Sequence, residues 1–93
     1  MANEIEANSH FTVHPDLEVR ILDGEAVILN VRTGAYFGTN SVGTHIWQAY
    51  TEGKTVAEVI DSVVARFEVD AEHAQTDVIA FTESLLKSGL LSV

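Results

Sequence analysis

The sequence contains no cysteine among its 93 residues, so disulfide bridges, thiolate zinc sites and a cysteine nucleophile are excluded. No run of apolar residues approaches the roughly 20 that a membrane-spanning helix needs. The first residues, Met1–Ser9, lack both the basic start and the apolar stretch of a secretory signal peptide. These absences lead us to expect a cytoplasmic protein that makes no contact with a membrane.

Basic residues are also scarce. The chain has five Lys and Arg residues against 14 Asp and Glu residues, which gives a formal net charge of -9. Binding to phosphate groups relies on clustered Lys and Arg, whereas the five basic residues here are scattered along the chain. We therefore expect no nucleic acid as a partner. The acidic balance would attract a basic peptide or a basic protein surface, although it would serve equally well to keep a small protein soluble.

The remaining composition is that of one small globular domain. Hydrophobic residues make up 46% of the chain and charged residues 20%, which argues against disorder. A chain of this length has room for a single core. We expect a flexible N-terminal tail over residues 1–12, followed by a single domain over residues 13–93.

The first half of the domain has the two-residue period of β-strands. Alternation over Leu17–Leu22 predicts a strand with one buried face. The following pair, Asp23-Gly24, favours a tight hairpin turn because both residues tolerate positive φ. A second strand is predicted over Ala26–Val31, and a second turn over Arg32–Gly34. The third strand, over Ala35–Gly38, completes an antiparallel meander.

The second half has the period and the capping residues of α-helices. Asn40 or Ser41 can cap a first helix that runs to about residue 50. Thr55 and Glu58 form the pattern of a capping box at the start of a second helix. Asp70 can cap a third helix, which Gly89 is placed to end. The apolar stripes of the second and third helices are Val56, Val59, Ile60, Val63, Val64 and Phe67, and Ala74, Val78, Phe81 and Leu85. Together these elements predict an α+β fold in which a three-stranded antiparallel meander precedes a three-helix bundle.

No catalytic or metal-binding pattern is visible. His10 and His14 lie four residues apart, but Pro15 follows directly and no helix is expected there. His45 and His73 fall on different predicted helices, and no HExxH motif is present. The serines lack a nucleophile-elbow context, and the glycines match no nucleotide-binding loop. We therefore expect a protein that is not an enzyme and that holds no metal and no cofactor.

The remaining candidate site is the open edge of the third strand. Such an edge presents unpaired N–H and C=O groups that can pair with an added strand. If the third helix packs alongside, a groove forms whose floor would come from Tyr36 or Phe37. Its wall would come from Asp77, Ala80, Phe81 and Ser84. Asp77 could pair with a basic residue of a bound peptide. The alternative is that the two aromatic residues belong to the sheet core and that Asp77 is a surface charge. A further alternative is that the open edge pairs with a second copy of the chain, which would make the protein a homodimeric structural or assembly subunit.

Four segments resemble the motifs of PqqD-like proteins, in the same order and spacing. Val27–Asn40 resembles the segment "LLD-x-x-TG-x-YYxLN", and Gly43–Trp47 resembles "G-x-x-IW". Thr55–Ile60 resembles "T-V-x-E-I". Asp77–Leu90 resembles "DV-x-x-F-x-x-L-x-x-x-GL", and the resemblance covers about residues 13–91.

The resemblance implies a winged-helix-like fold known as the RiPP precursor peptide recognition element. Domains of this family are not catalytic. They bind the leader segment of a ribosomally synthesised precursor peptide as an added strand between the third strand and the third helix, and they present the precursor to a modifying enzyme. That maturation enzyme is a radical SAM protein in coenzyme PQQ synthesis and a leader peptidase in lasso-peptide systems. The peptide-binding residues that the resemblance implies are Tyr36, Phe37, Gly38, Asp77, Ala80, Phe81 and Ser84.

Two departures from the family pattern bear on which precursor peptide the chain is expected to bind. Thr39 stands where the family usually has Leu, and the "PEG" segment of the quinone-cofactor members is absent. Both favour a PqqD-like chaperone for some other precursor peptide. The winged-helix likeness also raises nucleic-acid binding as an alternative, but it does so by analogy of fold alone.

Overall fold

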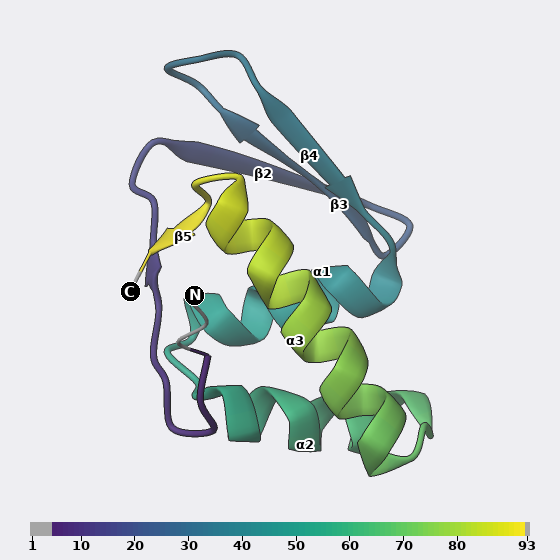
Figure 1. Ribbon diagram of the computed structural model, residues 1–93. Helices are drawn as coiled ribbons and strands as arrows, with labels where there is room; N and C mark the ends of the chain where they lie inside the picture. The colour runs from purple at the N-terminus through teal and green to yellow at the C-terminus, as the bar shows by residue number, and fades with distance from the viewer. Residues whose placement is uncertain (1–4, 93) are drawn as a thin grey trace.

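The computed structural model describes residues 5–92, and it has two small antiparallel sheets and three helices (Figure 1). The elements are β1 (Thr12–Val13), β2 (Leu17–Leu22), β3 (Glu25–Asn30), β4 (Tyr36–Thr39), α1 (Ser41–Thr51), α2 (Val56–Phe67), α3 (Ala71–Lys87) and β5 (Leu91–Ser92). Strands β2, β3 and β4 form the predicted meander, and the three predicted helices follow. The predicted α+β order is therefore confirmed.

The main sheet has the order β2-β3-β4, and its strands pair in a continuous register. Val19 lies opposite Ile28, and Ile28 lies opposite Phe37. The hairpin between β2 and β3 turns at Asp23 and Gly24, which have φ angles of 56° and 79°. Both angles are positive, as a tight two-residue hairpin requires, so the predicted turn is confirmed.

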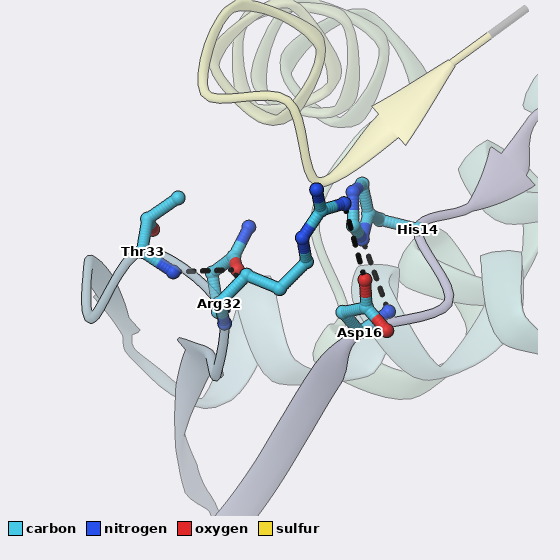
Figure 2. A network of polar contacts seen from close by, with 5 residues as sticks. His14, Asp16, Arg32 and Thr33 are labelled. Carbon is cyan, nitrogen blue, oxygen red and sulfur yellow. Dashed lines mark hydrogen bonds and ion pairs between the residues drawn. The ribbon is translucent and has the colours of Figure 1, made fainter.

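A cluster of polar contacts holds the turn between β3 and β4 (Figure 2). The Asn30 side-chain oxygen accepts hydrogen bonds from the N–H groups of Arg32 and Thr33, at 2.9 Å and 3.3 Å. The Arg32 guanidinium reaches the Asp16 carboxylate at 3.4 Å, and Gly34 has a φ of 81°. This turn sets the direction in which the chain enters β4.

The core lies between one face of the main sheet and the three helices (Figure 1). Side chains on a strand alternate between the two faces, so Ala26 and Ile28 of β3 point to the helices and are buried. The buried apolar side chains of this core include Ile28, Ile46, Trp47, Tyr50, Val59, Val63, Val78 and Leu85. The opposite face of the sheet is exposed to solvent. None of the helices within residues 5–92 has the length and apolar character needed to cross a membrane.

The helices begin at the residues that the sequence predicts. The Asn40 side chain accepts a hydrogen bond from the Gly43 N–H at 2.9 Å at the start of α1. Thr55 and Glu58 form a reciprocal capping box on α2, with bonds of 3.2 Å and 2.9 Å. Asp70 caps α3 by accepting from the backbone N–H of the residue three positions on, at 2.8 Å.

The second sheet, formed by β1 and β5, was not predicted. Thr12 pairs with Ser92, and Val13 pairs with Leu91. The His14 N–H extends this pairing by donating to the Leu90 carbonyl at 3.0 Å. The first and last elements of the described chain, β1 and β5, therefore lie side by side (Figure 1).

The stretch that the sequence predicts as a flexible tail makes specific contacts in its second part. The carbonyls of Ala7 and Ser9 accept hydrogen bonds from Ala57 and Val56, at 2.9 Å and 3.3 Å. The N–H groups of Ala57 and Val56 lie in the first turn of α2, where no carbonyl of the helix can accept from them, so they need acceptors from outside the helix. The Phe11 ring packs edge-on against the Tyr50 ring of the core, with ring centroids 5.3 Å apart. Residues 7–11 therefore contact the domain, whereas the boundary at residue 13 stays a prediction. Residues 1–4 and 93 lie outside the described part.

One buried hydrogen bond joins α1 to α3. The Tyr50 hydroxyl lies 2.8 Å from the Thr82 hydroxyl, which donates to the Val78 carbonyl at 2.6 Å. Both side chains are almost completely buried, and burial raises the pKa of the Tyr50 phenol. A buried hydroxyl needs a partner, so this pair fixes how the two helices meet.

We expect the substitution Thr82→Val to lower the free energy of unfolding by about 1–3 kcal/mol, because it removes the Tyr50 partner without changing the side-chain volume greatly. Urea unfolding measures the change. The double variant Tyr50→Phe/Thr82→Val should lose less than the sum of the two single variants, because it leaves no buried hydroxyl unpaired. Additive losses would contradict a direct interaction between the two hydroxyls.

Candidate functional site

Strand β4 is one end of the main sheet, so only one of its sides is paired. The Asn30 N–H donates to the Ala35 carbonyl at 2.9 Å, which identifies these residues as a hydrogen-bonded pair. Such pairs alternate along antiparallel strands, so Phe37 directs its N–H and C=O toward β3. By the same alternation, Tyr36 and Gly38 direct their N–H and C=O away from β3. The open edge thus offers two donors and two acceptors to an added strand.

A groove lies between the first half of α1 and the exposed side of α3. It has a volume of about 440 Å³ and is lined by Asn40, the N-cap of α1, by Val42, Gly43 and Ile46 of α1, and by Asp77, Ala80, Phe81 and Ser84 of α3. All four α3 residues that the sequence predicts for the groove wall therefore line this groove. The α1 residues were not predicted for the site, because Val42 and Ile46 also fit the apolar face of a helix that packs on the core.

An aromatic contact connects β4 to this groove. The rings of Phe37 and Phe81 meet edge to face, with centroids 5.8 Å apart and an interplanar angle of 70°. Phe37 therefore points to the helix side of the sheet. Tyr36 alternates to the opposite face, where it is 77% exposed. Of the two aromatic residues considered for the groove floor, only Phe37 has its side chain on the groove side, and Tyr36 offers its backbone.

Gly43 allows α1 to approach both β4 and α3 closely. A Cβ atom at this position would lie 2.8 Å from Cζ of Phe81, and it would overlap Oγ1 of Thr39. Any larger residue would force the Phe81 ring or the strand to move. The sequence signal for this close approach is the glycine of the "G-x-x-IW" segment.

The charge along the groove is negative. Asp77 is exposed on its α3 side, and the eight lining residues include no Lys or Arg. One turn earlier on α3, the hydrogen bond from His73 to Asp70 raises the pKa of the His73 imidazole, and the charge of Asp77 adds to that rise. The pKa of Asp70 is lowered, first by the hydrogen bond from the His73 backbone N–H and then by the bond to the His73 ring. Within residues 5–92, no group of three or more His, Asp or Glu side chains is arranged to hold a metal ion.

A family model identifies the relatives of this chain. The model described as "Coenzyme PQQ synthesis protein D (PqqD)" matches residues 25–91, which run from β3 to β5 and include every groove residue. The chain belongs to the PqqD family. No curated protein matches it.

Two solved structures resemble this PqqD-family chain closely. The first, "TbiB1 in Complex with the TbiA(beta) Leader Peptide", is 33% identical, with a TM-score of 0.78, and the match covers 85% of this chain and 92% of TbiB1. The second, "Lasso peptide synthetase B1 complexed with the leader peptide", is 27% identical, with a TM-score of 0.81 and coverage of 91% and 100%. The PqqD-family fold is therefore shared over nearly the full length of both proteins.

Proposed function

We propose that this PqqD-family chain is a non-catalytic peptide chaperone. It binds the leader segment of a ribosomally synthesised precursor peptide as a strand added to β4, beside α3, and presents the precursor to a maturation enzyme. The observation that carries the proposal is the open β4 edge, with its free groups at Tyr36 and Gly38, next to the groove between α1 and α3. The two similar solved structures support it, because both are complexes with leader peptides.

In this proposal, one part of the site provides affinity for the peptide and another part provides selectivity. Backbone hydrogen bonds to Tyr36 and Gly38 would hold any extended peptide, whatever its sequence. Every second side chain of the guest would turn toward the helices. Those side chains meet the apolar surface of Val42, Ile46 and Phe81, and a basic side chain would be favoured beside Asp77.

The chemical step in this proposal belongs to the partner. We infer that a radical SAM protein, a leader peptidase or another modifying enzyme acts on the precursor while the leader stays on β4. Two of the polar groove residues are already engaged within the chain: Asn40 caps a helix, and the Ser84 hydroxyl donates to the Ala80 carbonyl at 3.3 Å. Asp77 is therefore the polar groove residue that would orient a basic side chain of the guest.

Titration of the ¹⁵N-labelled protein with candidate leader peptides encoded near its gene tests the proposal. At micromolar peptide, we expect the amide signals of residues 35–39 and 77–85 to shift together, because both sides of the groove contact the guest. A scrambled peptide of the same composition is the control. If none of the candidate peptides shifts these signals, or if the shifts fall on β2 alone, the proposed site is wrong.

A further inference from the structure

The main sheet has a second open edge, at β2. No other strand within residues 5–92 pairs with the outer side of β2. The Val31 N–H donates to the Asp16 carbonyl at 3.0 Å, which fixes the alternation of hydrogen-bonded pairs between β2 and β3. The residues whose N–H and C=O face outward are therefore Leu17, Val19 and Ile21.

This edge lacks three features that commonly block pairing with another strand, namely a bulge, a proline and a lysine. Exposed edges are normally blunted by bulges, prolines or lysines. β2 contains neither proline nor lysine, and its register with β3 runs without a bulge from Leu17 to Leu22. Two of its apolar side chains are exposed, Ile21 at 46% and Leu22 at 76%.

The sequence of β2 is complementary to itself when read in the antiparallel direction. The segment Leu17-Glu18-Val19-Arg20-Ile21 can pair with a second copy about Val19 as the centre. Glu18 then lies opposite Arg20 of the second copy, and Leu17 lies opposite Ile21. Both charged side chains are exposed on the outer face of the sheet, where they already approach each other within the chain at 3.7 Å.

Hydrogen bonding and charge select the same register. Only pairings among Leu17, Val19 and Ile21 can form interchain bonds, because their N–H and C=O groups are the ones that face outward. Among the registers that meet this condition, a pairing centred on Glu18 would place two carboxylates opposite each other. A pairing centred on Arg20 would place two guanidinium groups opposite each other. Like charges directly opposite each other are unfavourable. A pairing centred on Leu17 or Ile21 would join only one of the three outward-facing residues to a second copy, so the register centred on Val19 is preferred.

We propose that β2 pairs antiparallel with β2 of a second copy of this chain, forming a dimer with two-fold symmetry. The two sheets become one six-stranded sheet, three strands from each copy, with β4 at both outer edges. Each groove between α1 and α3 stays open in this dimer. The homodimer considered from the sequence would instead use the edge at which peptide binding is proposed, so the two arrangements differ in whether a guest can bind.

Sedimentation velocity with two opposite charge reversals tests the dimer. We expect the wild-type chain to dimerise as its concentration rises. We expect Glu18→Arg and Arg20→Glu to weaken the dimer by about tenfold or more, because each places two like-charged pairs across the interface. An equimolar mixture of the two variants should form a heterodimer as strong as the wild-type dimer, because opposite charges face each other again.

A matched control and a second readout keep the test decisive. Arg66→Glu makes the same charge change as Arg20→Glu, but on an exposed residue of α2, so it should leave the dimer intact. A monomeric wild type at all soluble concentrations would overturn the proposal, and so would a dimer that both β2 variants retain, or variants whose mixture stays monomeric. Leader-peptide titration of Glu18→Arg reports separately on β4, so loss of the dimer with normal peptide binding leaves the proposed function intact.

Discussion

Replacement of Gly38 by proline is expected to weaken leader-peptide binding by about ten- to hundredfold while the fold is retained. Gly38 directs its N–H to the open side of β4, so proline removes one donor from the added strand and leaves a guest carbonyl unpaired, at a cost of about 1–3 kcal/mol. The bonds between β3 and β4 do not use this N–H. Proline is tolerated on edge strands at such positions. Peptide affinity by calorimetry and stability by urea unfolding measure the two effects.

The control for this prediction is Gly38→Ala. Gly38 does not have a positive φ, and a Cβ atom there meets no atom within 4 Å, so alanine fits and keeps the N–H. We expect it to bind peptide as the wild type does. If alanine weakens binding as much as proline does, the loss comes from side-chain bulk. If proline binds normally, the guest does not use the β4 edge.

Substitution of Gly43 by alanine is expected to lower the free energy of unfolding and to obstruct the groove at the same time. The new methyl group would lie 2.8 Å from Cζ of Phe81 and would overlap the Thr39 hydroxyl. Overpacking of this kind costs about 1–3 kcal/mol, whereas the better helix propensity of alanine returns about 1 kcal/mol at most. Because both contacts are far shorter than van der Waals distance, we expect a cost in the upper part of this range and a net loss of about 1–2 kcal/mol. The Phe81 ring should also move into the space of the guest, so peptide affinity should fall in the same variant.

Gly38→Ala again supplies the comparison, because it makes the same chemical change where there is open space. Urea unfolding and peptide titration of both variants separate crowding from the general effect of adding a methyl group. A Gly43→Ala variant as stable as the wild type and with unchanged affinity would contradict the close approach of Gly43 and Phe81 as a requirement of the site.

The sequence allowed prediction of those features that depend on local chemistry. The hairpin at Asp23 and Gly24 follows from the tolerance of these residues for positive φ, and the helix starts at Asn40, Thr55 and Asp70 follow from side chains that accept backbone N–H groups. The wall of the groove was also predictable, because residues spaced by three and four share one face of α3.

Features that depend on tertiary contacts could not be predicted in this way. Val42 and Ile46 fit a core-facing helical stripe, and periodicity alone cannot distinguish a stripe that is fully covered from one whose margin borders a groove. The choice between Tyr36 and Phe37 depends on the register of β4 against β3, which the length of the preceding turn sets. Strands β1 and β5 have two residues each, too few to show any period.

The pairing of β1 with β5 has a consequence for the order of folding. These strands come from opposite ends of the described chain, so their contact closes a loop that contains every other element. Closure of such a long loop is entropically costly until the intervening chain is already compact. We therefore expect β1 and β5 to join last and to separate first. In native-state hydrogen exchange, the amide of His14, which bonds to the Leu90 carbonyl, should exchange faster than the ladder amides of β3, through openings that leave the groove between α1 and α3 assembled.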